Sequence, residues 1–227
     1  MNTTSLSRLD RIRLTFRENR LMTSIELFIV LAIRAFELIN FPSDLFLFPL
    51  GWISLRLRKF GWRDVGLRRP ASWSRVLGLG ALIGVTYQLV EFYLIDPFVI
   101  WLSGQPMDLS QFDSMQGSIP NLVAYIIIGW LFGGLLEEMV YRGYLLNRFT
   151  DVFGNHRTGL AIGILASSTL FAIGHINMGI PSVLENFVFA LVFAGLYATT
   201  KRNLWLPILA HGFYNTLGLI LIYLGMS

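Results

Sequence analysis

Two adjacent glutamates and an arginine lie in one of the most apolar regions of this sequence. The stretch EEMVYRG begins at Glu137 and directly follows Leu135 and Leu136. Residues 121–134, before it, contain no charged residue. Glu138 and Arg142 are four residues apart, so on a helix they share a face and can form an ion pair. Glu137 lies about 100° around the helix from Glu138. One carboxylate can therefore be structural while the other takes part in chemistry.

Two further apolar segments each contain a histidine. His175 follows Phe171 by four residues at the end of one segment. His211 precedes Asn215 by four residues in another, so these two side chains also share a helix face. Ionisable groups inside a membrane span cost roughly 2.5–3.5 kcal/mol each on insertion scales and usually mark a site or a pathway. Glu185 is a further group of this kind.

Each of these polar groups also has a structural explanation. The charged residues of EEMVYRG can extend toward water from a helix end. His175 can cap a helix or be hydrogen-bonded in the core, and Glu185 can complement a helix dipole. The pair His211 and Asn215 can hydrogen-bond between helices, as polar residues do in membrane bundles.

Taken together, a carboxylate, two imidazoles and an amide are the components of a hydrolytic site. A carboxylate can take a proton from water, and an imidazole can share or orient that water. A second imidazole and an amide N–H can stabilise an oxyanion. The sequence contains no cysteine, no H-E-x-x-H, no G-x-S-x-G and no aspartate pair within a span. Glutamate with histidine is the chemistry that remains.

The elements that must position these groups are predicted to be membrane-spanning helices. The chain has 227 residues, 54% hydrophobic and only 14% charged, whereas soluble domains carry about 25% charged residues. A span needs about 20 apolar residues, and the runs are too long and too irregular for alternating strands. The predicted spans are 76–102, 119–147, 159–175, 183–200 and 204–225.

The region 21–55 is apolar but interrupted, among others by Glu26 and Arg34. It contains either one span with a short returning segment or a single irregular span. Two crossings suit the charge distribution better, because both ends of the region are basic. We therefore expect an all-α, polytopic transmembrane helix bundle of about 6–7 spans. One membrane domain would cover 21–227, with a four-helix catalytic core at 119–225.

Charge distribution predicts the orientation of the bundle. Residues 1–20 are rich in arginine and form either a basic amphipathic helix on the membrane surface or a disordered segment. The connection 103–118 contains acidic residues and no base, whereas basic residues concentrate in 56–75, 148–157 and 201–203. By the positive-inside rule the N-terminus is then cytoplasmic and the C-terminus lies outside. His156, in a basic connection, is expected to be a solvated loop residue.

The expected partners are a lipid bilayer and a membrane-associated peptide or protein, in an integral protein of the bacterial cytoplasmic membrane. Nucleic acid is not expected as a partner, because nothing organises the basic clusters into a folded reading surface. Two residues of the predicted site are expected at different depths in the membrane. If residue 159 enters from the cytoplasm, His175 lies roughly 24 Å into the membrane, whereas Glu137 is expected nearer the cytoplasmic side.

The motifs EEMVYRG, FAIGH and HGFYN resemble, in this order and on separate segments, three motifs of the CPBP family. That family includes type II CAAX prenyl proteases and bacteriocin-processing or Abi membrane proteins. The similarity covers about 120–217, and DVGLRRP further upstream resembles a loop of the family. The resemblance implies an intramembrane endopeptidase that cuts a prenylated or amphipathic peptide or protein. The alternative is a non-catalytic membrane scaffold or a bacteriocin self-immunity protein on the same fold.

The resemblance also implies roles for individual residues. Glu137 and His175 would activate the attacking water, and His211 and Asn215 would form the oxyanion hole. The supporting residues would be Glu138, Arg142 and Phe171. No cofactor is favoured, because an amide beside His211 suits an oxyanion hole better than a ligand shell. The alternative is a site for zinc or another divalent metal, with Glu137, His175 and His211 as its three ligands.

Overall fold

The computed structural model describes residues 19–36 and 43–226, and within these ranges it consists of helices and their connections. The α-helices are α2 (Arg20–Ala35), α3 (Asp44–Leu57), α4 (Trp73–Val90), α5 (Asp96–Ser103), α6 (Ile119–Ile128), α7 (Leu146–Phe153), α8 (Arg157–Ile173), α9 (Ile180–Thr199) and α10 (Trp205–Tyr223). Two π-helical segments, η2 (Glu91–Ile95) and η4 (Gly129–Leu145), continue α4 and α6, and η3 (Ser110–Met115) and η5 (Ile176–Met178) are short 3₁₀ helices. The prediction of an all-α fold is confirmed.

Four helical stretches in the described part of the chain are long and apolar enough to cross a bilayer: Trp73–Ser103, Ile119–Phe153, Ile180–Thr199 and Trp205–Tyr223. Two shorter apolar helices accompany them, Leu45–Leu57 and Arg157–Ile173. Large apolar side chains such as Leu82 and Trp101 point outward, as lipid-facing residues do. The prediction of a polytopic bundle is thus confirmed. About six to seven spans were expected, and the described residues contain four long and two shorter apolar helices.

The sequence upstream of α4 is described by the structure only in part. The region 21–55 contains two helices, α2 and α3, as expected for two elements rather than one irregular span. Residues 1–18, which cover nearly all of the predicted N-terminal amphipathic or disordered segment, lie outside the described residues.

Side-chain caps explain where several helices begin. Ser72 accepts from the Arg75 N–H at 3.3 Å at the start of α4, and His156 accepts from the Gly159 N–H at 3.2 Å at the start of α8. Such caps satisfy backbone donors that have no partner within the helix. His156 is exposed, as expected, but it also has this specific structural role.

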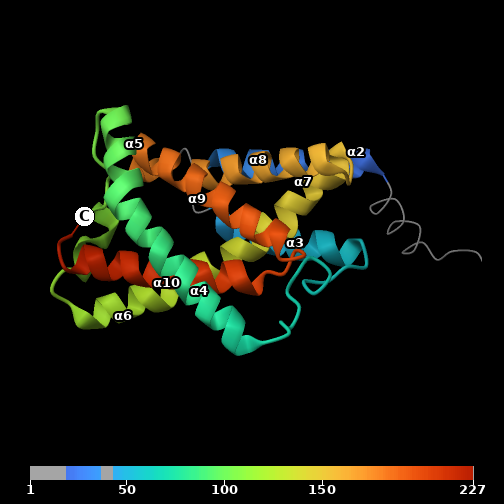
Figure 1. Cartoon of the computed structure of the whole chain (residues 1–227). Coiled ribbons are helices and arrows are strands. Elements are labelled where there is room, and N and C mark those ends of the chain that lie inside the picture. Colours follow the sequence, from blue (N-terminus) through green and yellow to red (C-terminus); the bar gives the residue numbers. More distant parts are fainter. Residues whose placement is uncertain (1–18, 37–42, 227) are drawn as a thin grey trace, which may run out of the picture.

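The helices α7 and α8 form a hairpin that sets the depth of the predicted site (Figure 1). Glu137 lies in η4, about four turns before the end of α7, and His175 lies about five turns after the start of α8. Because the two helices run in opposite directions from a short connection, both residues reach a similar depth. The expectation that Glu137 lies nearer the cytoplasmic side overlooked the uninterrupted helix from Ile119 to Phe153.

Basic connections gather at one end of the bundle. Arg202 donates to Asn155 at 3.4 Å, and the Leu204 N–H donates to the Gly66 carbonyl at 2.9 Å, so the connections before α4, α8 and α10 meet. The acidic connection 103–118 and the C-terminal end of α10 lie at the opposite end (Figure 1). This separation of charge reproduces the alternation that the sequence predicts.

Small residues bring η4 close to α10. A Cβ atom added at Gly134 would lie 3.4 Å from the Gly212 Cα, and one added at Gly212 would overlap the Trp130 ring. That ring is fixed by a 2.9 Å hydrogen bond from Trp130 Nε1 to the Thr216 hydroxyl. Small residues at helix contacts are typical of membrane bundles, where association depends on close packing. Here the contact places Glu137 of η4 beside His211 of α10.

We expect Gly212→Ala to destabilise the protein by about 1–3 kcal/mol, the usual cost of overpacking, because the new methyl group would overlap the anchored Trp130 ring. The matched control is Gly195→Ala in α9, where an added Cβ meets nothing within 4 Å. That change should leave the unfolding temperature unchanged or raise it, since alanine favours helix. Thermal unfolding of both variants in detergent is the measurement; equal unfolding temperatures would contradict the packing explanation.

Candidate active site

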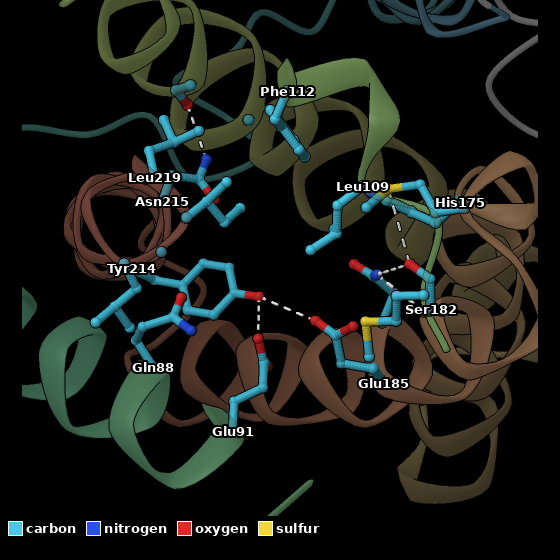
Figure 2. A pocket seen from close by; sticks show the side chains of 18 of the residues that line it. Gln88, Glu91, Leu109, Phe112, His175, Ser182, Glu185, Tyr214, Asn215 and Leu219 are labelled. Carbon is cyan, nitrogen blue, oxygen red and sulfur yellow. Dashed lines mark hydrogen bonds between the residues drawn. The ribbon is translucent and has the colours of Figure 1, made fainter. Parts of the chain in front are cut away.

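A cavity of about 700 Å³ opens between η4, the end of α8, α9 and α10 (Figure 2). All four predicted catalytic residues line it: Glu137, His175, His211 and Asn215. Most of the remaining wall is apolar, and Phe171 belongs to it. The structure therefore brings together, in one cavity, polar residues that the sequence distributes over three segments.

The two adjacent glutamates face different surroundings. Glu137 lines the cavity with 20% of its side chain exposed, and its Oε2 lies 4.0 Å from His211 Nε2. Glu138 is completely buried and lies behind the same imidazole, with Oε1 2.8 Å from His211 Nδ1. The two carboxylates thus contact opposite edges of one histidine ring, and only Glu137 is placed to meet a substrate.

Arg142 completes a buried ionic network. Its NH1 lies 3.0 Å from Glu138 Oε1, so the predicted ion pair along η4 is present. Its guanidinium also lies 4.8 Å from the centre of the Phe171 ring, within the range of a cation–π interaction. The guanidinium is thereby surrounded by its counter-charge on one side and aromatic rings on the other.

The contact with Glu138 determines which nitrogen of His211 carries the hydrogen. A carboxylate paired with arginine can only accept, so Nδ1 donates to it. In the neutral ring Nε2, on the cavity side, is then an acceptor. It can donate to a substrate oxyanion only when the ring is doubly protonated, a form that the Glu138 carboxylate stabilises. This condition was not visible in the sequence.

His175 lies just beyond the end of α8, with Nδ1 3.1 Å from the Phe171 carbonyl oxygen. Since a carbonyl only accepts, Nδ1 carries the hydrogen, and Nε2 is the basic nitrogen of the neutral ring. The imidazole also packs against the Phe171 ring, with centroids 4.9 Å apart. His175 therefore caps the end of α8, which was the alternative role considered from the sequence, and it also lines the cavity.

Arg34 of α2 supports this end of α8 and was missed by sequence reasoning. It is 2% exposed, and it donates to the Leu170 carbonyl at 2.9 Å and to the Phe171 carbonyl at 3.4 Å. A positive side chain at a helix C-terminus also complements the helix dipole. The sequence signal was a charge in an apolar region, which we interpreted only as an interruption of a span.

Asn215 is oriented by the backbone of η4. Its Nδ2 donates to the Gly129 carbonyl at 3.0 Å, which leaves the second N–H of the amide for another acceptor. A Cβ atom added at Gly133 would overlap the same amide nitrogen. Glycine at this position therefore keeps the space between Asn215 and η4 open.

A second group of acids also lines the cavity: Glu91, Asp96 and Glu185. Glu185 is 7% exposed and accepts from the Tyr214 hydroxyl at 3.3 Å, so it contacts more than the dipole of its own helix. Sequence reasoning considered only the spans after residue 119 and missed Glu91 and Asp96. The same signal, an ionisable residue within an apolar span, could have identified them.

The alternative metal site is not assembled by these side chains. Among the described residues, the one set of three acidic or histidine ligands within 4.8 Å of one another is Glu91, Asp96 and Glu185. Glu137 and His211 lie close together, but His175 does not complete a set of three with them. A catalytic zinc site needs three protein ligands that converge on one ion, and this arrangement does not provide them.

The class of protein follows from the fold and a family comparison. The fold is that of an integral membrane protein, and residues 119–217 match the family model of the type II CAAX prenyl endopeptidase Rce1-like proteins. Comparison with curated proteins and with solved structures gave no match. The resemblance to the CPBP family is thereby confirmed, and the matched segment is similar to a family of proteases.

The different surroundings of the adjacent glutamates lead to a paired prediction. Glu138→Gln removes the counter-charge of the buried Arg142 and should destabilise the protein by up to about 3–5 kcal/mol, the usual cost of breaking a buried ion pair. Glu137→Gln, beside it but facing the cavity, should unfold close to the wild-type temperature. Thermal unfolding in detergent compares the two; a Glu138→Gln protein of wild-type stability would contradict the structural role.

Proposed function

We propose that the protein is an intramembrane endopeptidase that hydrolyses a peptide bond of a membrane-associated peptide or protein with water activated by Glu137 and His175. The observation that carries this proposal is the shared cavity, in which Glu137 faces His211 across 4.0 Å. The family match to type II CAAX prenyl endopeptidases supports the same reaction class. The four residues proposed to act on the substrate are Glu137, His175, His211 and Asn215.

In the proposed mechanism Glu137 accepts a proton from a water molecule that His175 Nε2 helps to orient. The resulting hydroxide attacks the carbonyl carbon of the scissile bond, and the carbonyl oxygen becomes an oxyanion. Glu137 then transfers the proton to the leaving amine as the C–N bond breaks. The products are a carboxylic acid and an amine, and the glutamate returns to its starting form.

The oxyanion would be stabilised by the second Asn215 N–H and by His211 in its protonated form. Glu138 favours that form because its carboxylate contacts Nδ1 at 2.8 Å. The apolar wall of the cavity strengthens both interactions, since charges attract more strongly where water is excluded. Glu138 and Arg142 would thus act on the reaction through His211 without touching the substrate.

The position of the cavity suggests the side from which substrate enters. Pro106, Leu109 and Phe112 of the acidic connection line the cavity, as does Met226 near the end of the chain. The basic connections lie at the opposite end of the bundle. With those connections in the cytoplasm of a bacterial cell, the cavity opens toward the outer face, and α2 begins on the cytoplasmic side.

We expect Asn215→Ala to lower turnover by about 10²–10³, the usual loss when one oxyanion donor is removed, with little change in substrate binding. Asn121→Ala is a matched control, because Asn121 lies at the start of α6 and does not line the cavity. The substrate peptide can be identified by mass spectrometry as the one that accumulates uncut in cells carrying Glu137→Ala. Cleavage of that peptide by both asparagine variants is then measured; equal turnover would contradict the proposed role.

Because Glu137, His175 and His211 do not converge as a set of three ligands, we expect purified protein to retain peptide cleavage after treatment with a chelator. Activity measured before and after chelation, together with the zinc content of wild type and of His211→Ala, is the test. Stoichiometric zinc in the wild-type protein that is lost in His211→Ala would contradict the proposed mechanism. A protein that binds the peptide but never cleaves it would favour the scaffold alternative.

A further inference from the structure

Three carboxylates meet on the wall of the same cavity, two from the continuous helix Trp73–Ser103 and one from α9. Glu91 lies in η2, Asp96 at the start of α5 and Glu185 in α9, and one oxygen from each lies within 4.8 Å of the others. Tyr214 of α10 joins them, with its hydroxyl hydrogen-bonded to Glu91 and to Glu185 (Figure 2). The group is therefore held where the helix Trp73–Ser103 meets α9 and α10.

The hydrogen bonds within this group do not satisfy all of its carboxylate oxygens. Tyr214 has a single hydroxyl hydrogen, which cannot serve both Glu91 and Glu185 at once. Glu91 is 2% exposed, yet its Oε2 has no hydrogen-bond partner among the described residues, and the same holds for the buried Asp96 Oδ1. A proton shared between Glu91 and Glu185 would satisfy one oxygen and leave Asp96 without a donor.

In the described part of the chain, no lysine or arginine lines the cavity beside the three acids. No described ion pair involves any of the three carboxylates. Buried carboxylates normally pair with a cation or coordinate one, because isolated charge is costly away from water. A missing cationic partner of this kind points to a ligand that enters the cavity.

The cluster belongs to the same space as the proposed catalytic residues. Tyr214 and Asn215 both line this cavity, so a peptide whose scissile bond lies against Asn215 shares the space with Tyr214 and the acids around it. Between the two polar groups the wall is apolar, with Phe112, Met178 and Leu219 among its residues. The cavity therefore suits a peptide that combines an apolar stretch with a positive group near the bond to be cut.

We propose that Glu91, Asp96 and Glu185 form a subsite that binds a positively charged nitrogen group of the peptide substrate. A lysine or arginine side chain and a free α-amino group share the required chemistry. This inference deepens the proposed peptidase function and rests on it. Removing the charged group from the peptide leaves the carboxylates buried without a counter-charge, and removing a carboxylate from the protein weakens the attraction for the cation.

The test measures peptide binding separately from cleavage. Short fluorescent leucine–alanine peptides carry one lysine moved stepwise along the chain, and a matched set carries glutamine at each position. Binding is followed by fluorescence anisotropy on Glu137→Gln protein in detergent, so that no peptide is consumed. We expect a lysine position at which affinity exceeds that of the glutamine peptide about 10- to 100-fold. Comparing acetylated with free N-termini distinguishes the α-amino group from the side chain.

Added in the same background, Glu91→Gln should bring the lysine-to-glutamine affinity ratio close to one. Glutamine at position 91 can still accept from Tyr214, so the hydrogen bond can remain while the charge is lost. Asp96→Asn provides a second variant if Glu91→Gln does not fold. Asp113→Asn is the matched control, because Asp113 is exposed and lies outside the cavity wall, and it should keep the wild-type ratio.

Other outcomes would overturn the subsite. Equal affinity for lysine and glutamine peptides at every position would do so, even if wild-type protein cleaves them, and the peptidase function would then stand alone. Stabilisation by Ca²⁺ or Mn²⁺ alone that is lost in Glu91→Gln would assign the acids to a metal instead. Lysine-dependent binding without cleavage by wild-type protein would uphold the subsite and contradict the proposed function.

Discussion

The buried network of Glu138, Arg142 and His211 is the interaction on which the rest of the structure depends. Its 2.8 Å contact between Glu138 and His211 joins η4 to α10, and its 3.0 Å contact between Arg142 and Glu138 lies within η4. Within a membrane no water is present to hydrogen-bond these groups, so each depends on its partner in the network. The network therefore fixes the relative position of two helices, and it sets the hydrogen on His211 Nδ1 that decides what the ring can do in the cavity.

Two further arrangements act with this network. The glycines between η4 and α10 allow the close approach that the charged contacts require. On the other side, Phe171 packs between Arg142 and His175, while Arg34 of α2 fixes the backbone around it. The N-terminal helices thus contribute to the site although they supply none of its cavity-lining polar groups. Displacing any of these contacts would move an imidazole relative to Glu137.

Sequence patterning was sufficient for the fold class and for the groups that carry the proposed chemistry. Long apolar runs predict spanning helices because lipid cannot satisfy backbone hydrogen bonds, and the spans after residue 70 lie close to the observed helices. Helical spacing also predicted the contact between Glu138 and Arg142, because residues four apart share a helix face whatever the tertiary structure. The family resemblance followed from three ordered motifs and needed no coordinates.

Only the tertiary structure decided which edges of His211 the two glutamates contact, how deep Glu137 and His175 lie, and that Glu91 belongs to the same cavity. These facts depend on how helices distant in the chain pack, and spacing along one helix carries no information about the rotation or height of its neighbours. The continuation of α6 through η4 into α7 changed the depth of Glu137. What the sequence determined was the set of polar groups in an apolar bundle; their geometry came from packing.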